Sequence, residues 1–258
     1  MFKAVVFSSL YISLAAISLS LFYQFIGESI HLPRTIIIGL GTFISYNIVQ
    51  ILPLLKRPPI SERGRWIQAR QKALWFLIGA STVGIGLLSQ FLGLKDILNF
   101  SHLLLLSLLY EGVVLRKGLR SIPFFKPFLI SYVWAMTCAF PVFGTYTVLP
   151  TIECFLFIFS LCLLFDLRDV QDDLRQNIKT FANRYGSLAA KMLSVSSLLA
   201  SVLLLLMFTD LSILLLTSFL MLGIVLISTA NERSSDLYYL YLVDGLILVK
   251  LFLLLEAF

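Results

Sequence analysis

Long apolar stretches separated by short polar segments run through the whole sequence. Each stretch approaches the roughly 20 residues that a helix needs to cross about 30 Å of hydrocarbon. The sixth stretch is short and ends in a run of charged residues, and the chain contains no strand-like alternation of apolar and polar positions. The pattern predicts an all-α, polytopic membrane bundle with about nine transmembrane helices, near residues 4–26, 35–55, 73–92, 97–115, 127–148, 150–165, 186–208, 211–229 and 237–256.

The composition supports this interpretation. Hydrophobic residues make up 59% of the chain and charged residues 13%, and the mean hydropathy is +0.94. Soluble domains carry roughly 45–50% apolar and about 25% charged residues. We therefore expect one integral membrane domain over residues 1–258, and we exclude a disordered chain, a collagen-like fibre and a disulfide-stapled secreted module.

The basic residues behind the net charge of +6 are distributed unevenly along the chain. Most of the 20 basic residues lie at the N-terminus and in the loops after the second, fourth, sixth and eighth spans. Such an asymmetry predicts a cytoplasmic N-terminus and an external C-terminus, in a multi-pass protein of a bacterial inner membrane. The sequence contains no recognised nucleic-acid motif, so we expect the lipid bilayer and no nucleic acid as a partner.

The densest polar cluster is FDLRDVQDDLRQNIKTFANRYG, at positions 165–186. Asp166, Asp169 and Asp173 are spaced i, i+3 and i+7 and would share one face of a helix. Carboxylates this close repel one another unless a cation lies between them. Mg²⁺ prefers oxygen ligands and leaves coordination positions for phosphate, so the cluster predicts a metal-bridged diphosphate site. A solvated, salt-bridged cytoplasmic loop is the alternative.

A basic loop follows the second span, in SYNIVQILPLLKRPPISERGRW. It lies on the same predicted side of the membrane as the acidic cluster, so the two loops could face each other across one cavity. Basic side chains in the loop are candidate donors to phosphate oxygens; these are Lys56, Arg57, Arg63 and Arg65. The alternative is that they serve only to orient the protein in the membrane.

The segment DLRDVQDDLRQNIKTFANRYG resembles the second aspartate-rich motif of the UbiA superfamily of intramembrane prenyltransferases. In that motif a DxxDxxxD run is followed by a glycine, a Lys-Thr or Lys-Ser pair and a closing aromatic-glycine. KRPPISERGRW resembles the family's loop after helix 2, and LRSIPFFKPFLISYVW resembles its helix 4–5 connection. The matching motif residues here are Asp166, Asp169, Asp173, Lys179, Thr180, Tyr185 and Gly186.

This resemblance implies a helical bundle around a central cavity. Aspartates hold Mg²⁺, the metal holds an isoprenyl diphosphate, and the isoprenyl group passes to a hydrophobic acceptor. The implied metal ligands are Asp166, Asp169 and Asp173. The implied diphosphate-binding residues are Asn47, Lys56, Arg57, Lys126 and Lys179.

The sequence departs from the family pattern in the first motif, NDxxDxxxD. If Asn47 takes the asparagine position, the acidic positions fall on Ile48, Ile51 and Leu55, which cannot ligate Mg²⁺. Asn177 also replaces the usual glycine of the second motif. Two interpretations stay open: a prenyltransferase with one carboxylate row, or a non-catalytic or transporting UbiA-like protein that binds an isoprenoid or quinone-like lipid.

Charged residues within the predicted spans are further candidates, because burying charge in a bilayer is costly. Glu111, Asp244 and Lys250 are the main examples. Asp244 would either pair with a buried partner or line an acceptor pocket. An ion-coupled transporter that uses these three residues is a third interpretation, although it would leave the acidic cluster without a purpose.

Overall fold

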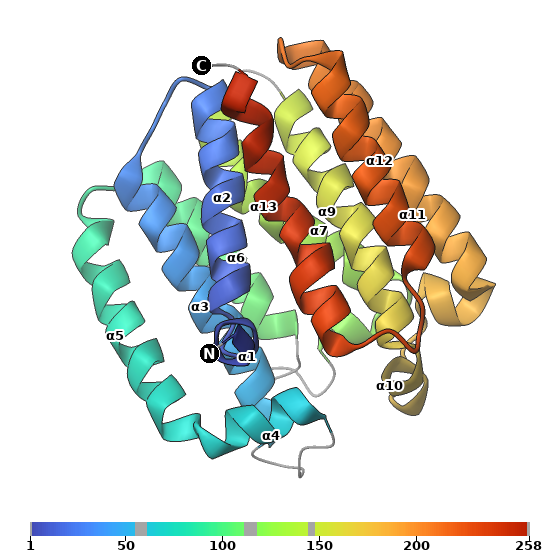
Figure 1. Cartoon of the computed structure of the whole chain (residues 1–258). Coiled ribbons are helices and arrows are strands. Elements are labelled where there is room, and N and C mark those ends of the chain that lie inside the picture. The colour runs from blue at the N-terminus through green and yellow to red at the C-terminus, as the bar shows by residue number, and fades with distance from the viewer. Residues whose placement is uncertain (1, 55–60, 111–117, 144–147, 257–258) are drawn as a thin grey trace.

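The computed structural model describes residues 2–54, 61–110, 118–143 and 148–256, and every regular element in these ranges is helical (Figure 1). The α-helices are α1 (Phe2–Phe7), α2 (Leu10–Ile26), α3 (Leu32–Leu54), α4 (Glu62–Ala69), α5 (Gln71–Ser89), α6 (Leu94–Tyr110), α7 (Phe125–Cys138), α8 (Phe140–Phe143), α9 (Leu149–Arg168), α10 (Val170–Arg175), α11 (Phe181–Phe208), α12 (Ile213–Thr229) and α13 (Asp244–Phe252). A π-helical turn, Tyr238–Val243, leads into α13, and 3₁₀ turns occupy Leu119–Ser121 and Leu253–Glu256.

Each of the nine predicted ranges contains a described helix, so the all-α prediction is confirmed. Four helices in the described ranges are long and apolar enough to cross a membrane, namely α3, α5, α9 and α11; the total number of spans stays a prediction. The sixth span was predicted too short. Its helix, α9, continues to Arg168 because partners inside the protein neutralise the charged residues of its last turn.

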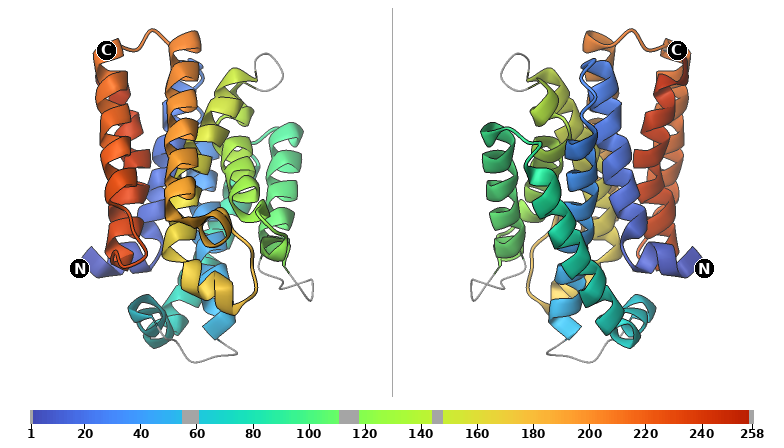
Figure 2. Two further views of the ribbon diagram at one scale, coloured as in Figure 1. Left: turned by 90° about the vertical axis from the view of Figure 1, so that its right-hand side faces the viewer. Right: turned by 90° about the vertical axis from the view of Figure 1, so that its left-hand side faces the viewer.

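Six helices enclose the centre of the bundle. α2 packs on α3, α3 on α6, α6 on α7 and α7 on α9, while α13 packs on α2, and the π-helical turn before it packs on α9. α5 lies outside this ring against α3, and α11 and α12 lie outside it beside α9 and α13 (Figures 1 and 2). α9 is the most deeply buried of the four long apolar helices.

The outer helices present large apolar side chains to the surroundings. In water such continuous apolar surface would promote association, whereas in a bilayer it faces hydrocarbon. These faces identify an integral membrane protein. Examples from α5, α11 and α12 are Phe76, Leu87, Leu203, Met207, Leu214 and Met221.

The two polar segments after the second and sixth spans lie at the same end of the bundle, as the sequence predicts. α4 and α10 both occupy the end at which the N-terminus lies, and the C-terminal helix ends at the opposite side (Figures 1 and 2). Ser61 caps α4 by accepting a hydrogen bond from the Gly64 backbone N–H, and Arg63 and Ile67 are the inward-facing side chains of this helix. The assignment of this end to the cytoplasm stays a prediction from charge.

A buried ion pair joins four helices in the other half of the bundle. The ammonium of Lys250 on α13 lies 2.7 and 2.8 Å from the two carboxylate oxygens of Glu153 on α9. Tyr23 on α2 and Ser201 on α11 donate hydrogen bonds to the same carboxylate. Both charged side chains are fully buried. Lys250 was considered for ion transport from sequence, but here it has a partner, Glu153, that sequence reasoning missed.

We expect Lys250→Met to destabilise the protein by about 3–5 kcal/mol, because it leaves the Glu153 carboxylate buried without its cation. Adding Glu153→Gln should recover part of the loss. Thermal unfolding in detergent measures both effects. Lys191→Met is the matched control, since the ammonium of Lys191 only donates an exposed hydrogen bond to the Ser228 carbonyl. Equal effects of the two Lys→Met variants would contradict a stabilising role for the buried pair.

Candidate functional site

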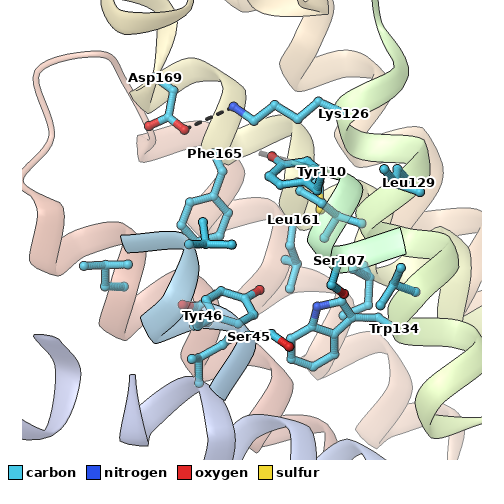
Figure 3. A pocket seen from close by; sticks show the side chains of 18 of the residues that line it. Ser45, Tyr46, Ser107, Tyr110, Lys126, Leu129, Trp134, Leu161, Phe165 and Asp169 are labelled. Carbon is cyan, nitrogen blue, oxygen red and sulfur yellow. Dashed lines mark hydrogen bonds and ion pairs between the residues drawn. The ribbon is translucent and has the colours of Figure 1, made fainter. Parts of the chain in front are cut away.

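A cavity of about 280 Å³ lies inside the ring of six helices. Its lining is mostly apolar, with aromatic rings from Tyr46, Tyr110, Trp134 and Phe165 (Figure 3). The ion pair between Lys126 and Asp169 lies at one end of the cavity, and Ser45, Tyr46 and Trp134 lie toward the other (Figure 3). An apolar chamber with a few convergent charged groups at one end is typical of a ligand site.

Two adjoining helices position the acidic residues at the charged end. α9 ends at Arg168, Asp169 follows as its cap, and α10 begins at Val170. The chain then reverses at Asn177, which has φ 55°, and the Ile178 backbone N–H donates to the Asp173 carbonyl at 2.8 Å. Asparagine tolerates this left-handed conformation better than other non-glycine residues. The backbone geometry therefore explains how Asn177 can replace a glycine in the motif.

The only glycine of the segment 165–186 lies at its end and introduces a kink into α11. Gly186 has φ 88° and ψ 166°, which separates the first turns of α11 from the rest of the helix. An L-residue with a side chain is strained in this region of backbone conformation. Thr180 caps the short first part by accepting from the Asn183 backbone N–H, and the Asn183 side chain accepts from the Thr180 N–H.

The three predicted metal ligands converge on the ammonium of Lys126. Its Nζ lies 3.2 Å from Asp166 Oδ1, 3.1 Å from Asp169 Oδ2 and 3.2 Å from Asp173 Oδ2. Lys126, on α7, is itself buried, as are Asp166 and Asp173. The expectation that a cation must separate the carboxylates is therefore met by a side chain of the protein. Lys126 was predicted to bind diphosphate; in this structure it binds the carboxylates.

Two arginines complete the charge balance of this cluster. Arg168 Nε lies 2.7 Å from Asp169 Oδ1, and Arg120 Nη2 lies 3.9 Å from Asp173 Oδ1. Burial raises the pKa of Asp173 above its usual range, against the opposing effect of Lys126. Burial also acts to raise the pKa of Asp169, but Arg168 and Lys126 outweigh it and hold that pKa below its usual range. Three basic groups thus face three aspartates.

The donor set suits a magnesium ion, but its position is taken by Lys126. Both carboxylate oxygens of Asp166 are buried and lack a hydrogen-bond partner, which leaves lone pairs for a cation. Oxygen ligands of this kind are those that Mg²⁺ prefers. As arranged here, the described residues offer no group of three or more acidic, histidine or cysteine side chains that holds a metal directly. A metal would fit once the Lys126 ammonium moved away.

Other predicted ligands lie outside the cavity. Asn47 is buried and donates hydrogen bonds to the carbonyls of Ser8 and Phe43, at 2.9 and 2.8 Å, so it ties α3 to the break between α1 and α2. Lys179 is exposed, and only its backbone carbonyl has a described role, accepting from the Phe124 N–H. Neither side chain is part of the cavity lining.

The positions of the missing first motif are packed with hydrocarbon. Ile51 is fully buried, and Ile48 packs in the same cluster with Ile67 and Leu74. This part of α3 therefore contributes no metal ligand. Four residues considered from sequence lie outside the described residues: Leu55, Lys56, Arg57 and Glu111.

Several lining residues were missed by sequence reasoning. Tyr46 follows Ser45 within an apolar span, and Tyr110 lies three residues after Ser107; all four line the cavity. Ser107 and Tyr110 are spaced i, i+3 and share one helical face, a signal that the sequence did contain, whereas the adjacent Ser45 and Tyr46 gave no such signal. Arg63 was named as a phosphate donor and does line the cavity.

Arg63 connects the basic loop to the membrane part of the site. Its guanidinium donates to Ser9 Oγ at 3.1 Å and to the Phe7 carbonyl at 3.4 Å. Burial and the nearby charge of Arg168 lower the pKa of Arg63 to about 10, so it stays protonated at neutral pH. The positive charge at this end of the cavity is therefore fixed in place by α4.

We expect Lys126→Met to lower the thermal stability of the protein by about 3–5 kcal/mol, because three carboxylates lose their shared cation. Mg²⁺ should then raise the unfolding temperature of this variant more than that of the wild type, since the metal can take the place of the ammonium. The control is Lys72→Met, which removes an exposed lysine. An identical Mg²⁺ response in Lys126→Met and wild type would show that the carboxylates do not bind the metal.

No protein-family model and no curated protein matches the sequence. Solved structures do resemble the fold. The apo structure of a UbiA homologue from Aeropyrum pernix K1 has a TM-score of 0.60 and 13% identity, over 100% of this chain and 99% of that chain. A structure of digeranylgeranylglyceryl phosphate synthase has a TM-score of 0.55 and 13% identity, over 97% of this chain and 98% of that chain. The chain therefore adopts the UbiA fold.

Proposed function

We propose that the chain is a UbiA-superfamily protein that binds an isoprenyl diphosphate and transfers the isoprenyl group to a hydrophobic acceptor. The observation that carries this proposal is the shape of the cavity. Charged groups gather at one end, and the remainder is apolar and aromatic. A ligand with a diphosphate head and a hydrocarbon tail matches both parts.

The head group would bind among the basic residues at the charged end. Lys126, Arg120 and Arg168 all line the cavity there, and Arg63 lies beside them on the wall. Asp166, Asp169 and Asp173 would hold Mg²⁺, which supplies positive charge to the diphosphate oxygens when bound. In that state the Lys126 ammonium turns from the carboxylates to a phosphate oxygen. The same side chain thus serves as a counter-ion in one state and a phosphate ligand in the other.

The chemistry proposed for the cavity is cleavage of the allylic carbon–oxygen bond. The electron pair of that bond leaves with the diphosphate, where the basic residues stabilise the developing charge. The allylic carbocation then lies among the aromatic faces of the cavity wall, for which Tyr46, Tyr110 and Trp134 are candidates. The surrounding apolar wall keeps water from this cation until the acceptor donates an electron pair to it and loses a proton to the released diphosphate.

A second candidate function is supported by the same site. The carboxylates are neutralised by side chains of the protein, and the first-motif positions are packed with apolar residues. A protein built this way could bind an isoprenoid or quinone-like lipid without transferring it, or move it between membrane leaflets. Metal-dependent diphosphate binding separates the two candidates.

We expect geranylgeranyl diphosphate to bind the detergent-purified protein in a Mg²⁺-dependent manner. Asp173→Asn should weaken this binding about 10- to 100-fold, because one of the three proposed Mg²⁺ ligands loses its charge. Asp172→Asn is the matched control. Asp172 is the neighbouring acid in the sequence, but its side chain is 70% exposed and pairs only with Arg175. Isothermal titration calorimetry with and without EDTA measures the affinities.

Equal binding by the Asp173 and Asp172 variants, or binding that ignores EDTA, would contradict the metal-dependent transferase. If the wild type instead binds geranylgeraniol as tightly as its diphosphate, the lipid-binding alternative is favoured. In both cases the measured quantity is the dissociation constant of the ligand, geranylgeranyl diphosphate or geranylgeraniol, from the purified wild-type protein or a single variant.

A further inference from the structure

Asp244 is a buried carboxylate in the wall of the cavity, and no described residue makes a hydrogen bond to it. Its side chain is 7% exposed and forms part of the cavity wall. Among the described residues it makes no hydrogen bond and no salt bridge. Buried carboxylates are normally paired or hydrogen-bonded, since an isolated one is costly. A ligand that donates a hydrogen bond to Asp244 would therefore reduce the cost of burying this carboxylate.

The backbone before Asp244 has an unusual conformation that fixes its position. Residues Tyr238–Val243 form a π-helical turn, and α13 begins at Asp244 itself. π-Helical turns are rare and are frequently found at functional sites. The next residue, Gly245, allows close contact with α2, because a Cβ there would lie 2.8 Å from the Tyr11 hydroxyl. Asp244 is thus held against the cavity by the backbone on both sides.

The charged groups that act on Asp244 come from two other elements. Arg168 at the end of α9 and Arg63 on α4 are the cations whose field reaches its carboxylate. The hydroxyl groups of Tyr11 on α2 and Tyr46 on α3 are the neutral polar groups near it. All four side chains line the same cavity. Two positive charges thus surround one negative charge.

We infer that Asp244 binds a hydroxyl group of the acceptor. This inference rests on the proposed function, because it assigns the second substrate to the part of the cavity wall formed by α13. A neutral O–H group donates to a carboxylate and brings no charge into a region that is already positive. A cationic group would be repelled by Arg63 and Arg168, and an anionic oxygen has no hydrogen to donate to the Asp244 carboxylate. The acceptor class is therefore an alcohol or a phenol.

The experiment compares two probes that differ by one methyl group, which removes the ability to donate a hydrogen bond. 4-Butylphenol has the hydroxyl, whereas 4-butylanisole carries a methyl ether in its place. Their dissociation constants are measured by calorimetry at one detergent concentration, so partition into micelles is the same for every variant. We expect the wild type to prefer the phenol and Asp244→Leu to lose about tenfold of that preference, the size of one charge-assisted hydrogen bond.

Two further variants control the experiment. Asp244→Asn keeps the shape and should lose part of the preference, since a neutral carboxamide oxygen accepts more weakly than a carboxylate. Asp236→Asn removes the other acid at the start of this segment, which is not part of the cavity lining, and should keep the preference. The thermal unfolding temperature of each variant reports whether it is folded.

The outcomes separate this inference from the proposed function. A phenol preference that is absent in the wild type, or unchanged in Asp244→Leu, overturns the inference; if geranylgeranyl diphosphate still binds, the proposed function stands. A preference that depends on Asp244 in a protein that does not bind the diphosphate overturns the proposed function and supports the hydroxyl site. A full preference in Asp244→Asn would also contradict a role for the negative charge.

Discussion

The cost of burying carboxylates governs how this bundle is assembled. α9 carries Glu153 near its beginning and Asp166 in its last turn, both fully buried. Each is neutralised by a lysine from another helix, Lys250 on α13 and Lys126 on α7. Because an unpaired charge in an apolar interior is strongly destabilising, these two lysines fix how α7 and α13 lie against the central helix. Most of the remaining packing is apolar and less directional, with a few interhelical hydrogen bonds such as Ser160–Ser194 between α9 and α11.

The two ion pairs at the ends of α9, Glu153–Lys250 and Asp166–Lys126, have different surroundings. The first is a structural contact, whereas the second lies at the candidate site. The Glu153 carboxylate is saturated by Lys250, Tyr23 and Ser201, so it has no capacity for a ligand. The Asp166 oxygens lack hydrogen bonds and lie at the wall of the cavity. A buried lysine paired with a carboxylate therefore stabilises the fold at one end of α9, and under the proposed function the lysine at the other end can give way to a metal ion.

Local patterns in the sequence predicted the helices and the acidic cluster, but not the partners across the fold. Apolar length located the spans, and the i, i+3, i+7 spacing grouped the three aspartates. Lys126 lies 47 residues before Asp173, and Glu153 lies 97 residues before Lys250; no local pattern connects them. Side-chain direction was also out of reach, which is why Asn47 and Lys179 were assigned to a cavity that neither lines.

The central claim is that one cavity takes a diphosphate at its charged end and an isoprenoid along its aromatic wall. The most direct measurement is an experimental structure of the wild-type protein with geranylgeranyl diphosphate and Mg²⁺. The account predicts that Lys126 Nζ has left the three aspartates for a phosphate oxygen, with the isoprenoid beside Tyr46 and Trp134. Lys126 still on the aspartates, with the ligand outside this cavity, would contradict it.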